Sequence, residues 1–153
     1  MACEQLKLEN QGCFRLYTVS RLIVQAYKPW FDRLGITYTQ YIVLLVLWEK
    51  DLQPVNDIAK RLYLETNTIT PLIQRMEQRK IISRRKDKND ARKVIVSLTE
   101  RGKAIQEEAA EIPGCMTELL AQKGVQAEQM IQLFPVLDNI IKAMTTQNAG
   151  EKQ

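Results

Sequence analysis

Residues 54–99 constrain the fold of this chain more than any other stretch. Residues 55–62 place apolar side chains at i, i+3, i+4 and i+7, which is the spacing of one helix face. A corner at 63–65 leads into a second helix, which we expect to have Thr66 or Asn67 as its N-cap. The apolar stripe of that second helix consists of Ile69, Leu72, Ile73 and Met76. Two short helices joined by a tight corner form the helix-turn-helix pattern.

A basic β-hairpin is predicted directly after the second helix. Residues 81–85 and 94–98 are predicted to be short strands, and 87–90 the polar loop between them. From Arg75 to Lys93 the chain carries nine basic and three acidic residues, an excess larger than the net charge of +4 of the whole protein. Clustered cations supply the phosphate contacts that dominate nucleic-acid affinity. A charged hairpin after a helix-turn-helix therefore indicates the wing of a DNA-binding domain.

The candidate DNA-binding residues divide between the second helix and the wing. A run of charge is more often a solvated loop, but this one coincides with the predicted hairpin, which favours DNA binding. In the second helix, the residues expected to face the major groove are Thr66, Asn67, Thr68, Thr70, Gln74 and Arg75. In the wing, the residues expected at the DNA backbone or in the minor groove are Arg84, Arg85, Lys86, Arg92 and Lys93.

Composition argues against several other functions. The chain has no histidine, which removes Ser-His and Cys-His catalysis and every zinc site that needs histidine. Its three cysteines are widely spaced and Gly-rich phosphate loops are absent, so we predict no metal, no cofactor and no enzymatic activity. The polar N-terminus does not resemble a signal peptide, and no apolar run is long enough to span a membrane. A cytoplasmic location with reduced thiols is therefore expected.

A long N-terminal helix is predicted ahead of the winged motif. We expect Asn10 to be its N-cap and Gly35 to end it, since glycine readily adopts the left-handed conformation of a helix stop. Pro29 lies inside this helix and predicts a kink or break near 27–28. Residues 40–50 are apolar on almost every side, which indicates a central buried helix.

The predicted architecture is mainly α with a small β-hairpin wing. We expect a single domain over 1–153, with the winged helix-turn-helix at about 37–99 and dimerisation helices at about 10–34 and 100–146. These terminal helices carry more apolar surface than the winged motif needs for cover, which favours a homodimer over helices that fold back on their own chain. A two-fold dimer would place two recognition helices ~34 Å apart, which suits an inverted repeat in double-stranded operator DNA.

Several sequence blocks identify a family that the chain resembles. The residues DAR at 90–92, followed by VIVSLT at 94–99, resemble the wing signature of the MarR-type winged-helix repressors. Within that family the chain resembles the organic-hydroperoxide-sensing repressors through the blocks NQGCFRLY, AYKP, LGITYTQY and RLYL. The chain departs from the family pattern at Gly12, where a larger apolar residue is usual, and at Pro54, where a threonine cap is usual.

The resemblance implies roles for individual residues. Cys13 matches the cysteine that reacts with organic hydroperoxide, and Tyr27 and Tyr38 match tyrosines that hydrogen-bond this sulfur from the other subunit. Arg92 matches an arginine that enters the DNA minor groove, braced by an aspartate at the position of Asp90.

The resemblance also implies a partner for the oxidised thiol. In two-cysteine members of the family, a resolving cysteine near the far end of the chain bridges to the other subunit's sensor. Cys115 is the candidate here, because it follows an interruption that 113–114 are expected to make in the helix capped by Thr99. Capture by a small cellular thiol remains the alternative.

Residue chemistry alone leaves the role of Cys13 open. Counted from Asn10 as N-cap, Cys13 lies in the first helical turn, where unpaired N–H groups and the helix dipole favour a reactive thiolate. A small buried core residue is, however, the commoner role of a free cysteine. Cys13 and Tyr27 share one helix stripe but are ~21 Å apart along it, so they can meet only between antiparallel helices of two subunits.

Three functions remain open from the sequence. The first, which the family blocks favour, is a repressor that releases its operator when organic hydroperoxide oxidises Cys13. The second is a MarR-type regulator relieved by a small aromatic ligand, with no thiol switch. The third is a thiol peroxidase, which would turn over and need a reducing partner.

Overall fold

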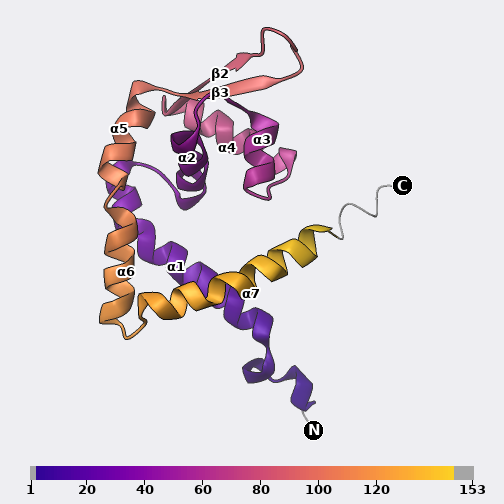
Figure 1. Cartoon of the computed structure of the whole chain (residues 1–153), viewed down its shortest axis with the longest axis vertical. Coiled ribbons are helices and arrows are strands. Elements are labelled where there is room, and N and C mark those ends of the chain that lie inside the picture. Colours follow the sequence, from indigo (N-terminus) through magenta and orange to yellow (C-terminus); the bar gives the residue numbers. More distant parts are fainter. Residues whose placement is uncertain (1–2, 147–153) are drawn as a thin grey trace.

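The computed structural model describes residues 3–146, which are mainly helical with one small antiparallel sheet (Figure 1). In chain order the elements are η1 (Glu4–Leu6) and η2 (Leu8–Asn10), both single 3-10 turns, then α1 (Gly12–Leu34), α2 (Tyr38–Glu49), β1 (Gln53–Pro54), α3 (Val55–Arg61), α4 (Thr66–Gln78), β2 (Ile82–Lys86), β3 (Val94–Leu98), α5 (Glu100–Ala109), α6 (Ile112–Gln122) and α7 (Ala127–Thr146). The predicted fold class is confirmed. In this part of the chain, no helix is both long and apolar enough to span a lipid bilayer.

The helix-turn-helix and the wing form one lobe at the top of Figure 1. α3 and α4 meet at the predicted corner, where Tyr63 has a left-handed φ of 54°. β2 and β3 pair antiparallel over their full length, with Lys86 opposite Val94 at the loop end. A third strand, β1, was not predicted; it adds to the free edge of β3 and gives the strand order β1-β3-β2. At the base of the wing, β3 therefore pairs with β1 on one edge and with β2 on the other. The loop of the wing projects beyond the sheet.

The core of this lobe lies among α2, α3, α4 and the sheet. The predicted apolar stripe of α4 is confirmed, since Ile69, Leu72, Ile73 and Met76 are all buried. The predicted central helix is also confirmed, and α2 buries six of its twelve residues. α2 begins earlier than expected, because Thr37 caps it and forms a reciprocal capping box with Gln40.

The boundaries of α1 correct two predictions. Asn10 is not the N-cap, because it closes η2 and its side-chain amide donates to the carbonyl of Glu4 at 2.8 Å. Gln11 takes the N-cap position, so Cys13 is the second residue of α1 rather than the third. Pro29 does not break the helix, which continues to Leu34; the packing of α1 against α2, α5 and α6 outweighs the loss of one backbone donor. Gly35 ends α1 with a φ of 67°, as predicted.

The interruption after the wing lies earlier than predicted. Thr99 caps α5 as expected, with its hydroxyl oxygen accepting the N–H of Gly102 at 3.1 Å. The break falls at 110–111, and Pro113 belongs to the first turn of α6. A proline is tolerated there because the first N–H groups of a helix have no partner within it. Cys115 is therefore a helical residue, and it is half-buried.

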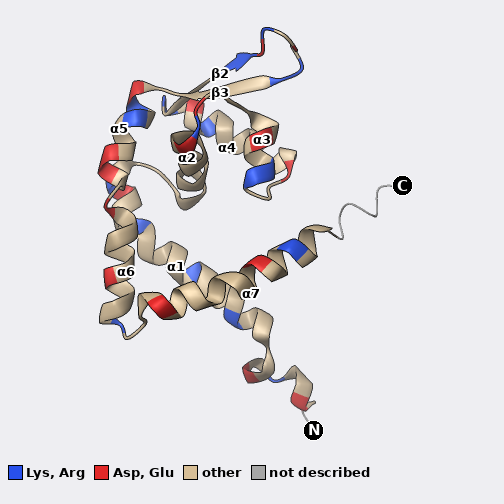
Figure 2. Ribbon diagram, viewed as in Figure 1, with Lys and Arg blue, Asp and Glu red and all other residues tan. Residues whose placement is uncertain are grey.

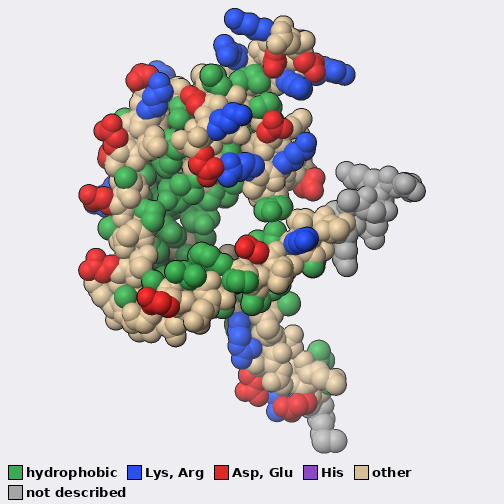
Figure 3. Space-filling model, viewed as in Figure 1, with side chains coloured by type: hydrophobic (Ala, Val, Ile, Leu, Met, Phe, Trp, Pro, Cys, Tyr) green, Lys and Arg blue, Asp and Glu red, His purple; other side chains and the backbone are tan. Residues whose placement is uncertain are grey.

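α1 and α7 carry apolar surface that the single chain leaves uncovered. In the view of Figure 1 they overlap below the winged lobe, while α5 and α6 connect the two regions. No residue of α7, all of which is described, is buried. The exposed large apolar residues of these two helices include Phe14, Leu16, Val19, Leu22, Ile131, Leu133, Phe134, Val136, Ile140 and Met144. Figure 3 shows hydrophobic side chains gathered around a hollow between α7 and the winged lobe.

Candidate DNA-binding surface and redox site

The start of α4 and the wing flank a cleft of about 190 Å³. The polar and basic side chains that line it are Asn56, Thr66, Thr70, Arg84, Arg92 and Lys93. Five of these six are predicted DNA-binding residues, which the fold brings together from α4, β2 and the wing loop. Asn56 of α3 also lines the cleft but was not among the predicted residues, because the prediction considered only the second helix and the wing. The signal available in the sequence was that Asn56 is a polar residue near the start of the first helix of the motif.

The remaining predicted residues of α4 lie on its solvent side. Asn67, Thr68, Gln74 and Arg75 are exposed, whereas Thr70 is half-buried at the cleft. The predicted N-cap is wrong, since Glu65 occupies the cap position and Thr66 and Asn67 are already helical. Glu65 makes no side-chain capping hydrogen bond, but its backbone carbonyl accepts the N–H groups of Thr68 and Ile69, each at 3.0 Å.

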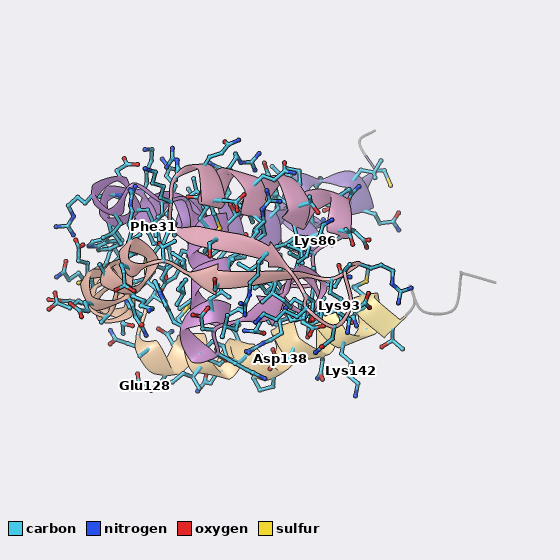
Figure 4. The ribbon with its side chains drawn as sticks, turned by 90° about the horizontal axis from the view of Figure 1, so that it is seen from above. Phe31, Lys86, Lys93, Glu128, Asp138 and Lys142 are labelled. Atoms are coloured by element: carbon cyan, nitrogen blue, oxygen red, sulfur yellow. The ribbon has the colours of Figure 1, made fainter. Side chains whose placement is uncertain are left out.

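The wing concentrates positive charge at the end of β2 and in the loop that follows it. Arg85, Lys86, Arg92 and Lys93 are exposed, and Figure 2 shows basic residues along the wing. Seen from above in Figure 4, Lys86 and Lys93 lie where the two strands enter the loop. The carboxylate of Asp90 accepts hydrogen bonds from Nε of Arg92 at 3.1 Å and from a terminal nitrogen at 3.3 Å.

Asp90 and Arg92 form an ion pair within the wing loop itself. Hydrogen bonds from the side chain and backbone of Arg92 lower the pKa of Asp90, so its carboxylate stays charged at neutral pH. The side chain of Arg92 remains 92% exposed. Asp90 therefore restricts the direction of the guanidinium without covering it.

Arg84 differs from the other basic residues of the wing. It forms an ion pair of 2.6 Å with Glu77 of α4, and its backbone N–H also donates to that carboxylate at 3.1 Å. These contacts with Arg84 lower the pKa of Glu77, so the pair persists at neutral pH. The structure thus places Arg84 at the junction of β2 and α4, where it fixes the wing relative to the recognition helix.

Cys13 lies in the first turn of α1 with an exposed side chain. Arg15, close by, donates to the backbone carbonyls of Gln11 at 3.1 Å and Glu9 at 2.6 Å. These bonds fold the N-terminal lead-in against the start of the helix. The solvent-exposed position of Cys13 differs from that of a core cysteine.

The tyrosines predicted to serve Cys13 form an aromatic cluster at the other end of α1. The ring centroids of Tyr27 and Tyr38 are 5.5 Å apart, and Tyr27 stacks on Phe31 at 5.2 Å. Burial raises the pKa of Tyr27, and the neighbouring phenols of Tyr38 and Tyr41 raise it further. The phenol of Tyr27 is therefore protonated at neutral pH and can donate a hydrogen bond.

A groove beside this cluster is open to the outside of the single chain. It has a volume of about 380 Å³ and is lined by residues of α1 and of the connection to α2, among them Val24, Phe31, Ile36 and Tyr38. Tyr27 follows Cys13 fourteen positions later in the unbroken helix, which corresponds to a rise of ~21 Å. Within one chain, the structure brings Tyr27 and Tyr38 together but leaves Cys13 apart from both.

The comparisons with known proteins agree with this arrangement. A family model described as the transcriptional regulator SarA/Rot matches residues 25–109. An organic hydroperoxide resistance transcriptional regulator of Bacillus subtilis is 41% identical over 145 residues, which cover 95% of this chain and 97% of that protein.

Two solved structures of AbfR, a Staphylococcus epidermidis protein, are also similar. Reduced AbfR bound to DNA is 37% identical with a TM-score of 0.78, covering 95% of this chain and 99% of AbfR. The disulfide form of AbfR is 38% identical with a TM-score of 0.64, covering 91% and 95%. The match to the family model and the extended identity to the Bacillus protein show that this chain belongs to the winged-helix transcriptional regulators of the SarA/Rot and MarR type, in the branch of the organic-hydroperoxide regulators.

Proposed function

We propose that the protein is a dimeric, cytoplasmic transcriptional repressor that binds operator DNA and releases it when organic hydroperoxide oxidises Cys13. The observation that carries this proposal is the division of the molecule into two surfaces. One presents α4 and a basic wing, and the other presents an exposed thiol on an uncovered apolar helix. The similarity to the organic hydroperoxide resistance regulator of Bacillus subtilis and to AbfR bound to DNA supports both parts.

A second copy of the chain would complete the redox site. Exposed large apolar side chains recur along both α1 and α7, whereas an ordinary monomer surface has them scattered singly. If two α1 helices run antiparallel, Cys13 of one subunit reaches the groove beside Tyr27 and Tyr38 of the other. The same two-fold axis would pair two recognition helices with an inverted repeat.

The proposed reaction is a two-electron oxidation of sulfur. The Cys13 thiolate attacks the terminal oxygen of the hydroperoxide, so that an S–O bond forms and the O–O bond breaks. The sulfur becomes a sulfenic acid, and the departing alkoxide takes up a proton and leaves as the alcohol. Hydroxyl donors from Tyr27 and Tyr38 would stabilise the attacking thiolate through charge-assisted hydrogen bonds.

Operator binding by the reduced protein, measured before and after one equivalent of an organic hydroperoxide, tests the proposal. We expect tight, salt-dependent binding before treatment, lost affinity afterwards, and recovery with a dithiol reductant. Continued turnover of peroxide would favour the peroxidase instead. Release by a small aromatic acid but not by hydroperoxide would favour the ligand-relieved regulator.

The tyrosine hydroxyls are expected to set the rate of oxidation. In Tyr27→Phe or Tyr38→Phe, the rate of Cys13 oxidation should fall on the order of tenfold, because a hydrogen bond to a charged group contributes about 1.5–3 kcal/mol. Stopped-flow loss of thiol measures the rate. The control is Tyr63→Phe, which removes an exposed phenol hydroxyl at the corner of the helix-turn-helix. This variant should leave the rate of Cys13 oxidation unchanged. Parental rates in both tyrosine variants would exclude this site.

Cys115 is proposed to resolve the oxidised thiol of the other subunit. Its thiol would attack the sulfenic acid at Cys13, forming the S–S bond and releasing water. Because a disulfide needs Cα atoms within ~7 Å, its formation in a dimer with more distant sulfurs would have to move α1 or α6.

Non-reducing electrophoresis after peroxide treatment tests the resolving role. A covalent dimer should form in the parent and in Cys3→Ser but not in Cys115→Ser. A covalent dimer that persists in Cys115→Ser would contradict the assignment, and a purely monomeric parent would favour capture by a small thiol.

A further inference from the structure

The end of α1, the end of α4 and the start of α5 meet at one junction on the surface of the protein. A terminal guanidinium nitrogen of Arg79 donates to the backbone carbonyl of Gly35 at 2.7 Å, across 44 residues of sequence. The backbone carbonyl of Arg79 accepts in turn from the guanidinium of Arg101 at 2.9 Å. Gly35 ends α1, Arg79 is the C-cap of α4, and Arg101 lies in the first turn of α5.

The side of the junction that faces α5 is held firmly. Thr99 places its hydroxyl 2.7 Å from the carbonyl oxygen of Lys80 and 2.8 Å from that of Ile81. Lys80 has a left-handed φ of 57°, so the chain reverses directly after α4. A Cβ on Gly102 would lie 2.3 Å from the carbonyl oxygen of Ile81, which shows how closely α5 approaches this turn. These contacts hold the start of α5 against the end of α4.

The side of the junction that faces α1 depends on fewer contacts. α1 packs chiefly on α2, α5 and α6. The Arg79–Gly35 hydrogen bond adds a directional link from α1 to the recognition helix. Because α1 is unbroken from Gly12 to Leu34, a displacement of its Cys13 end reaches Gly35 without being absorbed in between.

The geometry points to Arg79 as the positioning residue through which the state of the redox site reaches the recognition helix. The inference rests on the proposed function. α1 carries Cys13, and α5 leads into α6, which carries Cys115. A shift of α1 on oxidation acts on Arg79 through Gly35, and a shift of α6 that is passed to α5 across the break at 110–111 acts on Arg79 through Arg101. The orientation of α4 then changes, and its fit to DNA is lost.

The readout that separates coupling from a merely structural role is the ratio of operator affinities of the reduced and the oxidised protein. A structural role lowers both affinities together and leaves their ratio unchanged, whereas a coupling role changes the ratio. The parent, Arg79→Ala, Arg79→Lys and Arg101→Ala should be measured at one salt concentration, together with their rates of Cys13 oxidation. Arg33→Ala is the matched control, since it removes an exposed arginine from the last turn of α1.

We expect the ratio to fall at least about fivefold in Arg79→Ala, the lower end of typical allosteric coupling, with an unchanged oxidation rate. Arg79→Lys should retain most of the ratio, because an ammonium group can still donate to the Gly35 carbonyl. Arg101→Ala should also lower the ratio of the reduced and oxidised affinities. If Arg79→Ala does not fold, the ratio measured for Arg101→Ala tests the inference in its place. A parental ratio in the folded Arg79 and Arg101 variants would overturn the inference. A parent that does not respond to hydroperoxide would instead refute the proposed function.

Discussion

Cys13→Ser is expected to abolish the release of operator DNA by organic hydroperoxide while leaving the affinity of the untreated protein unchanged. The serine hydroxyl has nearly the same size as the thiol, and it lies in the first turn of α1, away from α4 and the wing. A hydroxyl cannot form a sulfenic acid or a disulfide, so no oxidation at this position can be transmitted. Titration of labelled operator with protein, before and after one equivalent of hydroperoxide, measures both quantities.

The matched control for this variant is Cys3→Ser. Cys3 is also exposed and lies in the N-terminal lead-in, where its thiol donates to the side chain of Gln5 at 3.3 Å. Its loss removes one oxidisable sulfur without touching α1, so the response should remain parental. If Cys13→Ser released DNA on peroxide treatment as readily as the parent, the thiol switch would be refuted, and another oxidisable residue would have to be the sensor.

Arg92→Ala should weaken operator binding by about 1–3 kcal/mol, which corresponds to a ~5–150-fold loss of affinity. Its guanidinium is almost fully exposed and is held in one direction by Asp90, so it can enter a groove without being ordered first. An arginine inserted into a narrow minor groove meets an enhanced negative electrostatic potential. This attraction adds to the one that any exposed cation has for the phosphate backbone. Competition titration at moderate salt measures the loss.

Lys93→Ala provides the comparison for Arg92→Ala. It removes the same charge one residue further along the exposed loop. For a phosphate contact, the expected result is a smaller loss of affinity and a salt dependence shallower by about one counterion. Equal losses and equal changes of salt slope for both variants would show that Arg92 acts only as a phosphate contact. Unchanged affinity in Arg92→Ala would contradict the assignment of the wing to DNA.

Local patterns predicted most of the winged lobe because its signals lie close together in sequence. The apolar stripe of α4 and the β-branched residues of β3 follow the repeats of a helix and a strand, and both were confirmed. β1 was missed because two residues have no detectable period, and it exists only through its pairing with β3 some forty residues later. The N-caps of α1 and α4 were predicted wrongly because the conformation of the preceding residues determines where a helix begins. At α1, for example, Asn10 belongs to η2, so Gln11 takes the cap position.

Charge alone could not separate the roles of neighbouring arginines. Arg84, Arg79 and Arg92 look equivalent in the sequence, where each contributes to the same basic segment. The structure pairs Arg84 with Glu77 inside the lobe, links Arg79 to α1, and leaves Arg92 exposed beside Asp90. These differences depend on which helices and strands contact each other in the folded chain. The local sequence around each arginine does not show those contacts.

The sequence by itself determined the class of fold and the position of the recognition helix and the wing, and its family blocks led to the proposal of Cys13, Tyr27 and Tyr38 as a redox site. Helical and strand periods, clustered charge and family blocks are properties of residues that are close in sequence. They can therefore be recognised from the sequence alone. Only the tertiary structure decided that Tyr27 and Tyr38 share one cluster, that Cys13 stands apart and exposed, and that α1, α4 and α5 join at Arg79. Each of these is a contact across a long sequence separation, which depends on how whole helices pack rather than on any local preference.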